Sequence, residues 1–100
     1  MAGRRQPAKP PARLRALRTK IDKLDENIQA LIGARAACAQ EIAALKVRAG
    51  DANFYRPERE VDVLRRVIAR NSGPLGSEEM ARLFREIMSA CLALEMPMQI

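Results

Sequence analysis

The feature that most constrains the fold is a seam of apolar residues that recurs at steps of three and four from Leu14 to Leu45. No proline and a single glycine, Gly33, fall within residues 12–49. Steps of three and four place such residues along one face of an α-helix. The sequence therefore predicts one uninterrupted helix over residues 12–49, roughly 55 Å long at ~1.5 Å per residue. Its seam consists of Leu14, Leu17, Ile21, Leu24, Ile28, Leu31, Cys38, Ile42 and Leu45.

A helix of this length constrains the assembly as well as the fold. A compact monomer of 100 residues has a radius of gyration of about 13 Å. The helix would protrude from such a monomer and leave its apolar seam in water. We therefore expect the chain to form at least a dimer.

Two shorter helices are expected beyond the turn signal at residues 50–53. Pro57 suits the first position of a helix over residues 58–71, and Ser77 can cap a third helix that Pro97 would end. The sequence carries no strand signal, so the fold class is all-α, with one very long helix and two shorter ones per chain. The expected inner faces are Val61, Leu64, Val67 and Ile68 on the second helix, and Met80, Leu83, Phe84, Ile87, Met88, Cys91 and Leu94 on the third.

The cysteines and the lengths of the apolar runs indicate the cellular compartment of the protein. Cys38 and Cys91 stand on apolar stripes without metal-ligand spacing, and the chain has no histidine. We therefore expect two small core residues, no metal site and a reduced, cytoplasmic setting. No apolar run approaches the length of a membrane span, and the first residues lack the apolar core of a signal peptide. We expect no membrane association.

The net charge of +6 is concentrated at the start of the chain. Residues 1–13 form a basic, Pro-rich leader that we expect to be disordered, and from residue 14 onward fourteen basic residues face twelve acidic ones. One Tyr, two Phe and no Trp offer few stacking platforms for single strands. We expect no nucleic-acid partner, a domain over residues 14–96, and a tail or junction over residues 97–100.

Arg35 interrupts the seam at a position where an apolar side chain is due. An unpaired buried charge costs several kcal/mol, by rough estimate, so this position favours an anionic ligand. Lys46 follows eleven residues later, which puts it on the same face at roughly 16 Å along the axis. The two cations could hold the two ends of one small anion.

Arg18 lies seventeen residues before Arg35, roughly 25 Å along the helix, too far to share a small ligand within one chain. If two antiparallel copies cross near residue 29 or 30, symmetry brings the partner's Arg18 to the level of residues 40–42. A cationic pocket would then form twice per dimer. The alternatives are that Arg18 and Lys46 are ordinary charges flanking the seam, and that Arg35 only fixes register or oligomer state.

Two further sites carry acidic residues. Glu95 follows the apolar stripe of the third helix into its last turn, where the helix dipole and partial desolvation both favour the neutral acid. The alternative is a solvent-exposed terminal glutamate. Arg59 and Glu60 fall in the first turn of the second helix and could form a surface ion pair.

Several short motifs follow one another in a fixed order. They are LRTKID (17–22), LD (24–25), LIGAR (31–35), Lys46, YRPERE (55–60) and LFREIMS (83–89). In order and spacing they resemble the all-α (AroQ-type) chorismate mutases, most of all the mutase domain at the start of bifunctional chorismate mutase/prephenate dehydratase proteins. The resemblance covers about residues 14–96.

The resemblance implies an intertwined homodimer of the chorismate mutase II type, with two active sites shared between the chains and no cofactor. It implies that chorismate is isomerised to prephenate on the route to phenylalanine and tyrosine, and it allows for a fused prephenate dehydratase in the full-length protein. Arg35 and the partner's Arg18 would bind the two substrate carboxylates. Lys46 would donate to the ether oxygen and a carboxylate, Glu60 would accept from the ring hydroxyl, and Arg59 would support the site.

Three positions depart from what some relatives carry. By the resemblance, Glu95 would stand nearest the ether oxygen, where several relatives have Gln, and only its protonated form could donate to that oxygen. Cys91 stands where some relatives have a serine near the substrate, and Arg56 where some have an aspartate. We count Cys91 and Arg56 as substrate-binding candidates without assigned roles.

Two alternative functions stay open on the sequence. Isochorismate pyruvate lyase shares this fold and could use the same cationic pocket. A non-catalytic helical dimer could bind nucleic acid through the basic leader, in which case binding would be salt-sensitive and would disappear without residues 1–13. That interpretation leaves Arg35 and Glu95 unexplained.

Overall fold

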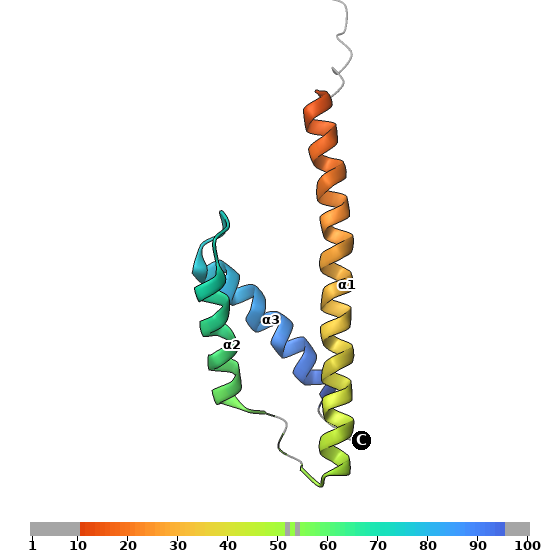
Figure 1. Ribbon diagram of the computed structural model, residues 1–100, viewed down its shortest axis with the longest axis vertical. Helices are drawn as coiled ribbons and strands as arrows, with labels where there is room; N and C mark the ends of the chain where they lie inside the picture. The colour runs from red at the N-terminus through yellow and green to blue at the C-terminus, as the bar shows by residue number, and fades with distance from the viewer. Residues whose placement is uncertain (1–10, 52, 54, 96–100) are drawn as a thin grey trace, which may run out of the picture. The chain divides into compact units, whose positions relative to one another are not determined.

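The computed structural model describes residues 11–51, 53 and 55–95. It contains three α-helices, α1 (Ala12–Arg48), α2 (Pro57–Arg70) and α3 (Ser77–Glu95) (Figure 1). Because the described residues contain no strand, the predicted all-α class and the order of one long and two shorter helices are confirmed. The expected disorder of the leader and the stop at Pro97 fall largely outside the described residues, although α1 already includes residues 12 and 13.

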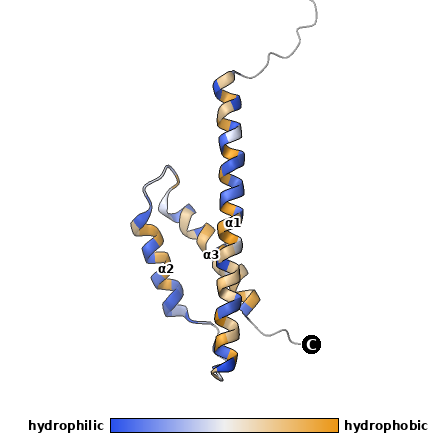
Figure 2. Cartoon of the chain, turned by 45° about the vertical axis from the view of Figure 1, so that its right-hand side comes forward, coloured by the Kyte–Doolittle hydropathy of each residue, from blue (hydrophilic) through white to orange (hydrophobic). Residues whose placement is uncertain are grey.

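The chain divides into two compact units, Met1–Leu31 and Ile32–Ile100. In the first unit every described residue is exposed, including the seam residues Ile21 (54%), Ile28 (53%) and Leu31 (70%). Hydrophilic and hydrophobic residues follow one another in turn along α1, as expected for a helix with a single apolar seam (Figure 2). The side chains of this unit therefore leave an apolar stripe uncovered within the single chain.

In the second unit α2 and α3 pack side by side as an antiparallel pair (Figure 1). The buried apolar residues of the described chain all belong to this unit: Ala39, Val67, Ala81 and Cys91. Three of the four have small side chains, so the buried core is modest for 100 residues.

Part of the predicted core is wrong for the single chain. Val61 and Ile68 on α2 and Leu83 and Leu94 on α3 are about half exposed. Cys38, expected in the core, is exposed too, whereas Cys91 is buried as predicted. The reason is that α2 and α3 cover each other along one side only, and no other described element covers the remaining apolar side chains.

The turn between α1 and α2 explains where the long helix ends. Gly50 has φ +74°, a left-handed conformation that favours glycine. The N–H of Gly50 donates to Val47 O at 3.1 Å and the N–H of Asp51 donates to Lys46 O at 2.8 Å. This pair of bonds is a Schellman motif, which satisfies the last carbonyls of α1 and turns the chain out of the helix.

The starts of α2 and α3 follow from Pro57 and Gly76. Pro57 occupies the first turn of α2, as predicted, and the Arg56 carbonyl accepts from the N–H groups of Arg59 (3.1 Å) and Glu60 (3.2 Å). Ser77 is the first helical residue of α3, not its cap as predicted, because the Gly76 carbonyl accepts from the N–H of Met80 at 3.0 Å. None of the described helices is both long and apolar enough to cross a membrane.

Candidate functional site

A cavity of about 440 Å³ lies within the second unit, between the last part of α1, the start of α2 and the end of α3. Its volume is in the range of small-molecule sites. Its wall includes seven of the eight candidate residues singled out from the sequence. The lining residues are Arg35, Cys38, Ala39, Ile42, Lys46, Tyr55, Arg56, Arg59, Glu60, Val63, Met88, Cys91, Leu92 and Glu95.

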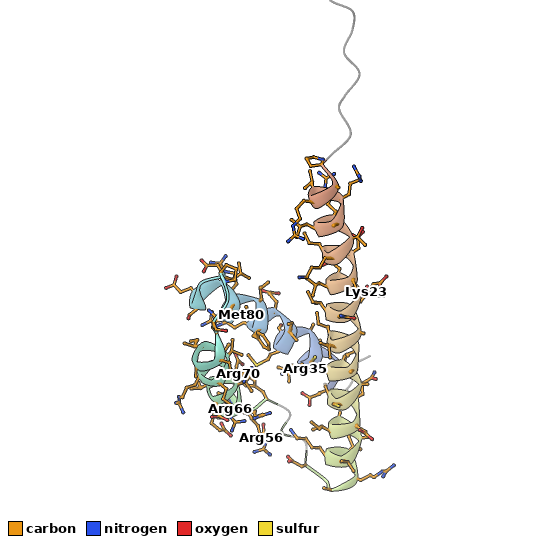
Figure 3. All side chains as sticks on the ribbon, turned by 45° about the horizontal axis from the view of Figure 1, so that its top comes forward. Lys23, Arg35, Arg56, Arg66, Arg70 and Met80 are labelled. Carbon is orange, nitrogen blue, oxygen red and sulfur yellow. The ribbon has the colours of Figure 1, made fainter. Side chains whose placement is uncertain are left out.

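Helix α1 places Arg35 and Lys46 on the same wall of this cavity, as their spacing of eleven residues predicts. Arg35 is half-buried on the side of α1 that the cavity shares with α3 (Figure 3). No hydrogen bond or ion pair joins Arg35 to another described residue. A half-buried guanidinium without a protein partner is a ready donor to an anionic ligand.

Lys46 is half-buried, and its Nζ donates to the carbonyl of Asn53 at 3.1 Å. Asp51 accepts from the N–H of Asn53 at 2.9 Å and from Nη2 of Arg56 at 3.1 Å. The N–H of Asn53, and after it the charges of Arg56 and Lys46, lower the pKa of Asp51. The carboxylate is therefore ionised around neutral pH. It contacts Arg56 directly and is linked to Lys46 through Asn53.

The start of α2 supplies Arg56, Arg59 and Glu60 to the cavity. Arg59 Nη1 lies 3.8 Å from Oδ2 of Asp62, so Arg59 pairs with Asp62, whereas the sequence left open a surface pair with Glu60. The two neighbours point in different directions on the helix, whereas residues three apart share a face. Glu60 is half-buried and has no cationic partner among the described residues.

Helix α3 supplies a buried thiol and a half-buried carboxyl group. Cys91 is 4% exposed, and Glu95, the last residue of α3, is half-buried among lining residues that include Met88 and Leu92. The predicted placement of Glu95 on the inward face is confirmed. Glu95 has no ion-pair partner in the described part of the chain, and so it stays available to a ligand.

Arg18 is the candidate that the cavity does not include. It lies on the exposed surface of α1 in the first unit, whereas every lining residue belongs to the second. A contribution of Arg18 to this cavity from a partner chain remains a prediction.

Charge in the cavity favours a small dianion. Arg35, Lys46, Arg56 and Arg59 contribute four cations to its wall, against the carboxyl groups of Glu60 and Glu95. No group of three or more His, Cys, Asp or Glu side chains within the described residues could hold a metal ion.

Sequence reasoning missed several residues around the cavity. Tyr55, Ile42 and Val63 line it, and Asp51 and Asn53 accept hydrogen bonds from two of its cations. The segment around Asp51 and Asn53 was interpreted only as a turn, because Gly, Asp and Asn are common turn residues. The signal that could have pointed further is the presence of an acidic residue between two basic candidates, Lys46 and Arg56.

Comparison with known proteins places this cavity in a family context. The model of the family described as chorismate mutase type II matches residues 17–96. The bifunctional chorismate mutase/prephenate dehydratases of Stutzerimonas stutzeri and Pseudomonas aeruginosa are 58% and 55% identical to the chain over 91 residues. Each alignment covers 87% of this chain, which spans 25% of the length of either relative.

Solved structures show the same fold. The chorismate mutase (form II) of Thermus thermophilus superposes with a TM-score of 0.79 at 37% identity, over 83% of this chain and 93% of that one. The chorismate mutase of Helicobacter pylori in complex with prephenate gives a TM-score of 0.73 at 28% identity, over 82% and 88% of the two chains.

Proposed function

This chain belongs to the chorismate mutase type II family, and on that premise we propose that it isomerises chorismate to prephenate. The observation that carries the proposal is the cavity that α1 lines with Arg35 and Lys46 and α3 lines with Glu95. Two cations three helical turns apart suit a small molecule with two carboxylates. Most of the remaining lining is apolar, which suits a ring.

The proposed reaction requires few chemical groups from the protein. In a concerted [3,3] rearrangement the ether C–O bond breaks while a new C–C bond forms, without a proton transfer, a nucleophile or a cofactor. The enzyme must hold the substrate in its folded conformer and aim donors at the oxygen that gains negative charge. Arginine, lysine and a protonated carboxyl group can do this without histidine.

The proposed roles follow the positions around the cavity. Arg35 and the partner's Arg18 bind the two carboxylates and restrict the flexible enolpyruvyl arm. Lys46 donates to the ether oxygen and to a carboxylate, and protonated Glu95 donates to the same oxygen. Supporting contacts come from Glu60, which accepts from the ring hydroxyl, from Arg59, and from Arg56 and Cys91 on the wall.

The contribution of Arg18 requires a second copy of the chain. The exposed seam of α1 supplies the surface for one, because its side chains from Ile21 to Leu31 have no cover within the described chain. Two antiparallel helices that cross near residue 29 or 30 would bring the partner's Arg18 between Arg35 and Lys46. The proposed enzyme is therefore a homodimer with two shared sites.

The biological setting forms part of the proposal. Prephenate would feed phenylalanine and tyrosine synthesis in the cytoplasm, in keeping with the free thiols of Cys38 and Cys91. In a protein organised like the bifunctional relatives, a prephenate dehydratase would take up the product.

A direct assay tests the activity. Purified chain is incubated separately with chorismate and with isochorismate, and prephenate and pyruvate are quantified. We expect chorismate to disappear with equimolar formation of prephenate. Pyruvate from isochorismate without any prephenate would instead identify a lyase and contradict the proposal.

Complementation between two inactive variants tests the shared site. Arg18→Ala and Arg35→Ala homodimers should each be nearly inactive. In a mixed dimer one site loses both arginines and the other keeps both, so mixing should restore up to about a quarter of wild-type activity when exchange is random. Persistent inactivity after verified subunit exchange would rule out a site shared in this way.

A further inference from the structure

Asp51 is the centre of a small hydrogen-bonded cluster between α1 and α2 that includes two residues of the cavity wall, Lys46 and Arg56. One carboxylate oxygen, Oδ1, accepts from the N–H of Asn53 at 2.9 Å. The other, Oδ2, accepts from Nη2 of Arg56 at 3.1 Å. Asp51 itself does not line the cavity, whereas Arg56 does. The carboxylate therefore holds a cavity cation without itself forming part of the cavity wall.

The same cluster reaches the second cation at this end of the cavity. The Nζ of Lys46 donates to the carbonyl of Asn53 at 3.1 Å. Asn53 is the residue whose N–H Asp51 accepts, and the N–H of Asp51 donates to the carbonyl of Lys46 at 2.8 Å. Both the backbone and the side chain of Lys46 are thus connected to the segment that Asp51 anchors.

We infer that Asp51 is a positioning residue, which aligns the guanidinium of Arg56 directly and the ammonium group of Lys46 through Asn53. This inference rests on the proposed function. A guanidinium has five N–H donors, so the bond to Asp51 leaves further donors for a substrate carboxylate. The inference also gives Arg56 a role: it binds substrate from the rim of the cavity, in an orientation set by Asp51.

Two substitutions of Asp51 separate its contact with Arg56 from its contact with Asn53. Asp51→Asn removes the charge that holds Arg56 but keeps an oxygen that can accept from the N–H of Asn53. Asp51→Ala removes both contacts. Because Arg56 would serve binding and Lys46 the breaking bond, the two variants should differ in which kinetic constant they change.

Steady-state kinetics with chorismate provide the measurement. We expect Asp51→Asn to raise KM by about fivefold, the upper range for an exposed ion pair, with kcat nearly unchanged. We expect Asp51→Ala to lower kcat as well, by about tenfold, because a displaced donor loses its alignment with the ether oxygen. Glu78→Gln, which removes an exposed carboxylate outside this cavity, is the control and should change neither constant.

A double-mutant cycle distinguishes positioning from a general effect on the fold. In an Arg56→Ala background Asp51→Asn should raise KM no further, because the group on which it acts is absent. An equal rise in KM with and without Arg56, or wild-type constants in Asp51→Asn, would overturn the inference. Wild-type chain that does not consume chorismate would instead overturn the proposed function, and the two failures are thereby distinguished.

Discussion

At the scale of single residues, Arg35 is the position where helix packing favours an apolar side chain but the proposed ligand requires a cation. A seam that served only association would carry an apolar side chain there, yet the guanidinium lies half-buried on the cavity wall without a protein partner among the described residues. Such a residue is retained at a cost to stability, as is common for groups that bind ligands. Stability and activity should therefore respond to its replacement in opposite directions.

Replacing Arg35 by methionine tests this opposition. We expect Arg35→Met to lower kcat/KM by at least about a hundredfold, because a charge-assisted carboxylate contact is lost. Unfolding free energy should stay the same or rise by about 1 kcal/mol, since a desolvated charge is replaced by an apolar side chain of similar size. Chorismate kinetics and urea unfolding check the two expectations. A variant that is both inactive and strongly destabilised would assign Arg35 a structural role.

Glu95 makes the proposed reaction sensitive to pH. Only the protonated carboxyl group can donate to the ether oxygen, and an ionised one would repel the developing negative charge. Activity of the wild type should fall with rising pH, and Glu95→Gln, whose amide can donate at any pH, should relieve that fall. Profiles of kcat from about pH 4 to about pH 9 provide the measurement. An identical decline in both proteins would exclude Glu95 as its origin.

Asp51 makes the fold sensitive to acid. Its pKa lies below the ordinary value of 3.8, chiefly because of the N–H of Asn53, so its contribution to stability is full above that value. The contribution disappears as pH falls through the lowered pKa. We expect Asp51→Asn to be less stable than wild type at about pH 6, and the difference to shrink as pH falls through the lowered pKa of Asp51. A stability difference that persists unchanged in acid would mean that the carboxylate charge is not responsible.

The site could be predicted in part from single residues. Arg35 and Lys46 were found through helical spacing, which fixes directions along one element without knowledge of the rest. Asp51 was missed, because its role depends on how a turn folds back on Lys46, and spacing says nothing about that. The placement of Arg18 depends on a second chain and stays a prediction.

At the scale of elements, the helices were predictable because their ends carry strong local signals. Gly50 ends α1 within one residue of the predicted boundary, and Pro57 starts α2. The prediction for Ser77 was wrong, since a serine can serve either as the cap or as the first helical residue. Inner faces were less predictable, because Val61 and Leu83 fit the helical period but have no element packed over them in the described chain.

Two glycines, one within α1 and one just beyond its end, provide a matched test of whether local backbone conformation sets the end of α1. Gly50 has φ +74°, so Gly50→Ala should cost about 1 kcal/mol of unfolding free energy. Gly33 lies inside the helix with nothing within 4 Å of an added Cβ, so Gly33→Ala should stabilise by about 0.5–1 kcal/mol. Thermal and urea unfolding of both variants would decide. A shift of the same sign in both would contradict the assigned end of α1.

At the scale of the whole molecule, the single chain is incomplete in two respects. Its described core holds four buried residues, and the seam of α1 stays exposed. Its cavity collects seven candidates but not Arg18. One event, the pairing of two seams, would supply both the missing burial and the missing arginine. Stability and activity should therefore depend on the same interface.

A charge in the middle of the seam tests this dependence. Ile28 is 53% exposed and lies close to the proposed crossing point, so Ile28→Lys should place two like charges in the interface and dissociate the dimer. Val47, 66% exposed on α1 but off the seam, provides the control in Val47→Lys. Analytical ultracentrifugation should show that Ile28→Lys is a monomer and that Val47→Lys stays a dimer. Ile28→Lys should also lose activity, because each site then lacks the partner's Arg18. An active monomer would show that one chain can complete the site alone, and that the seam serves a purpose other than catalysis.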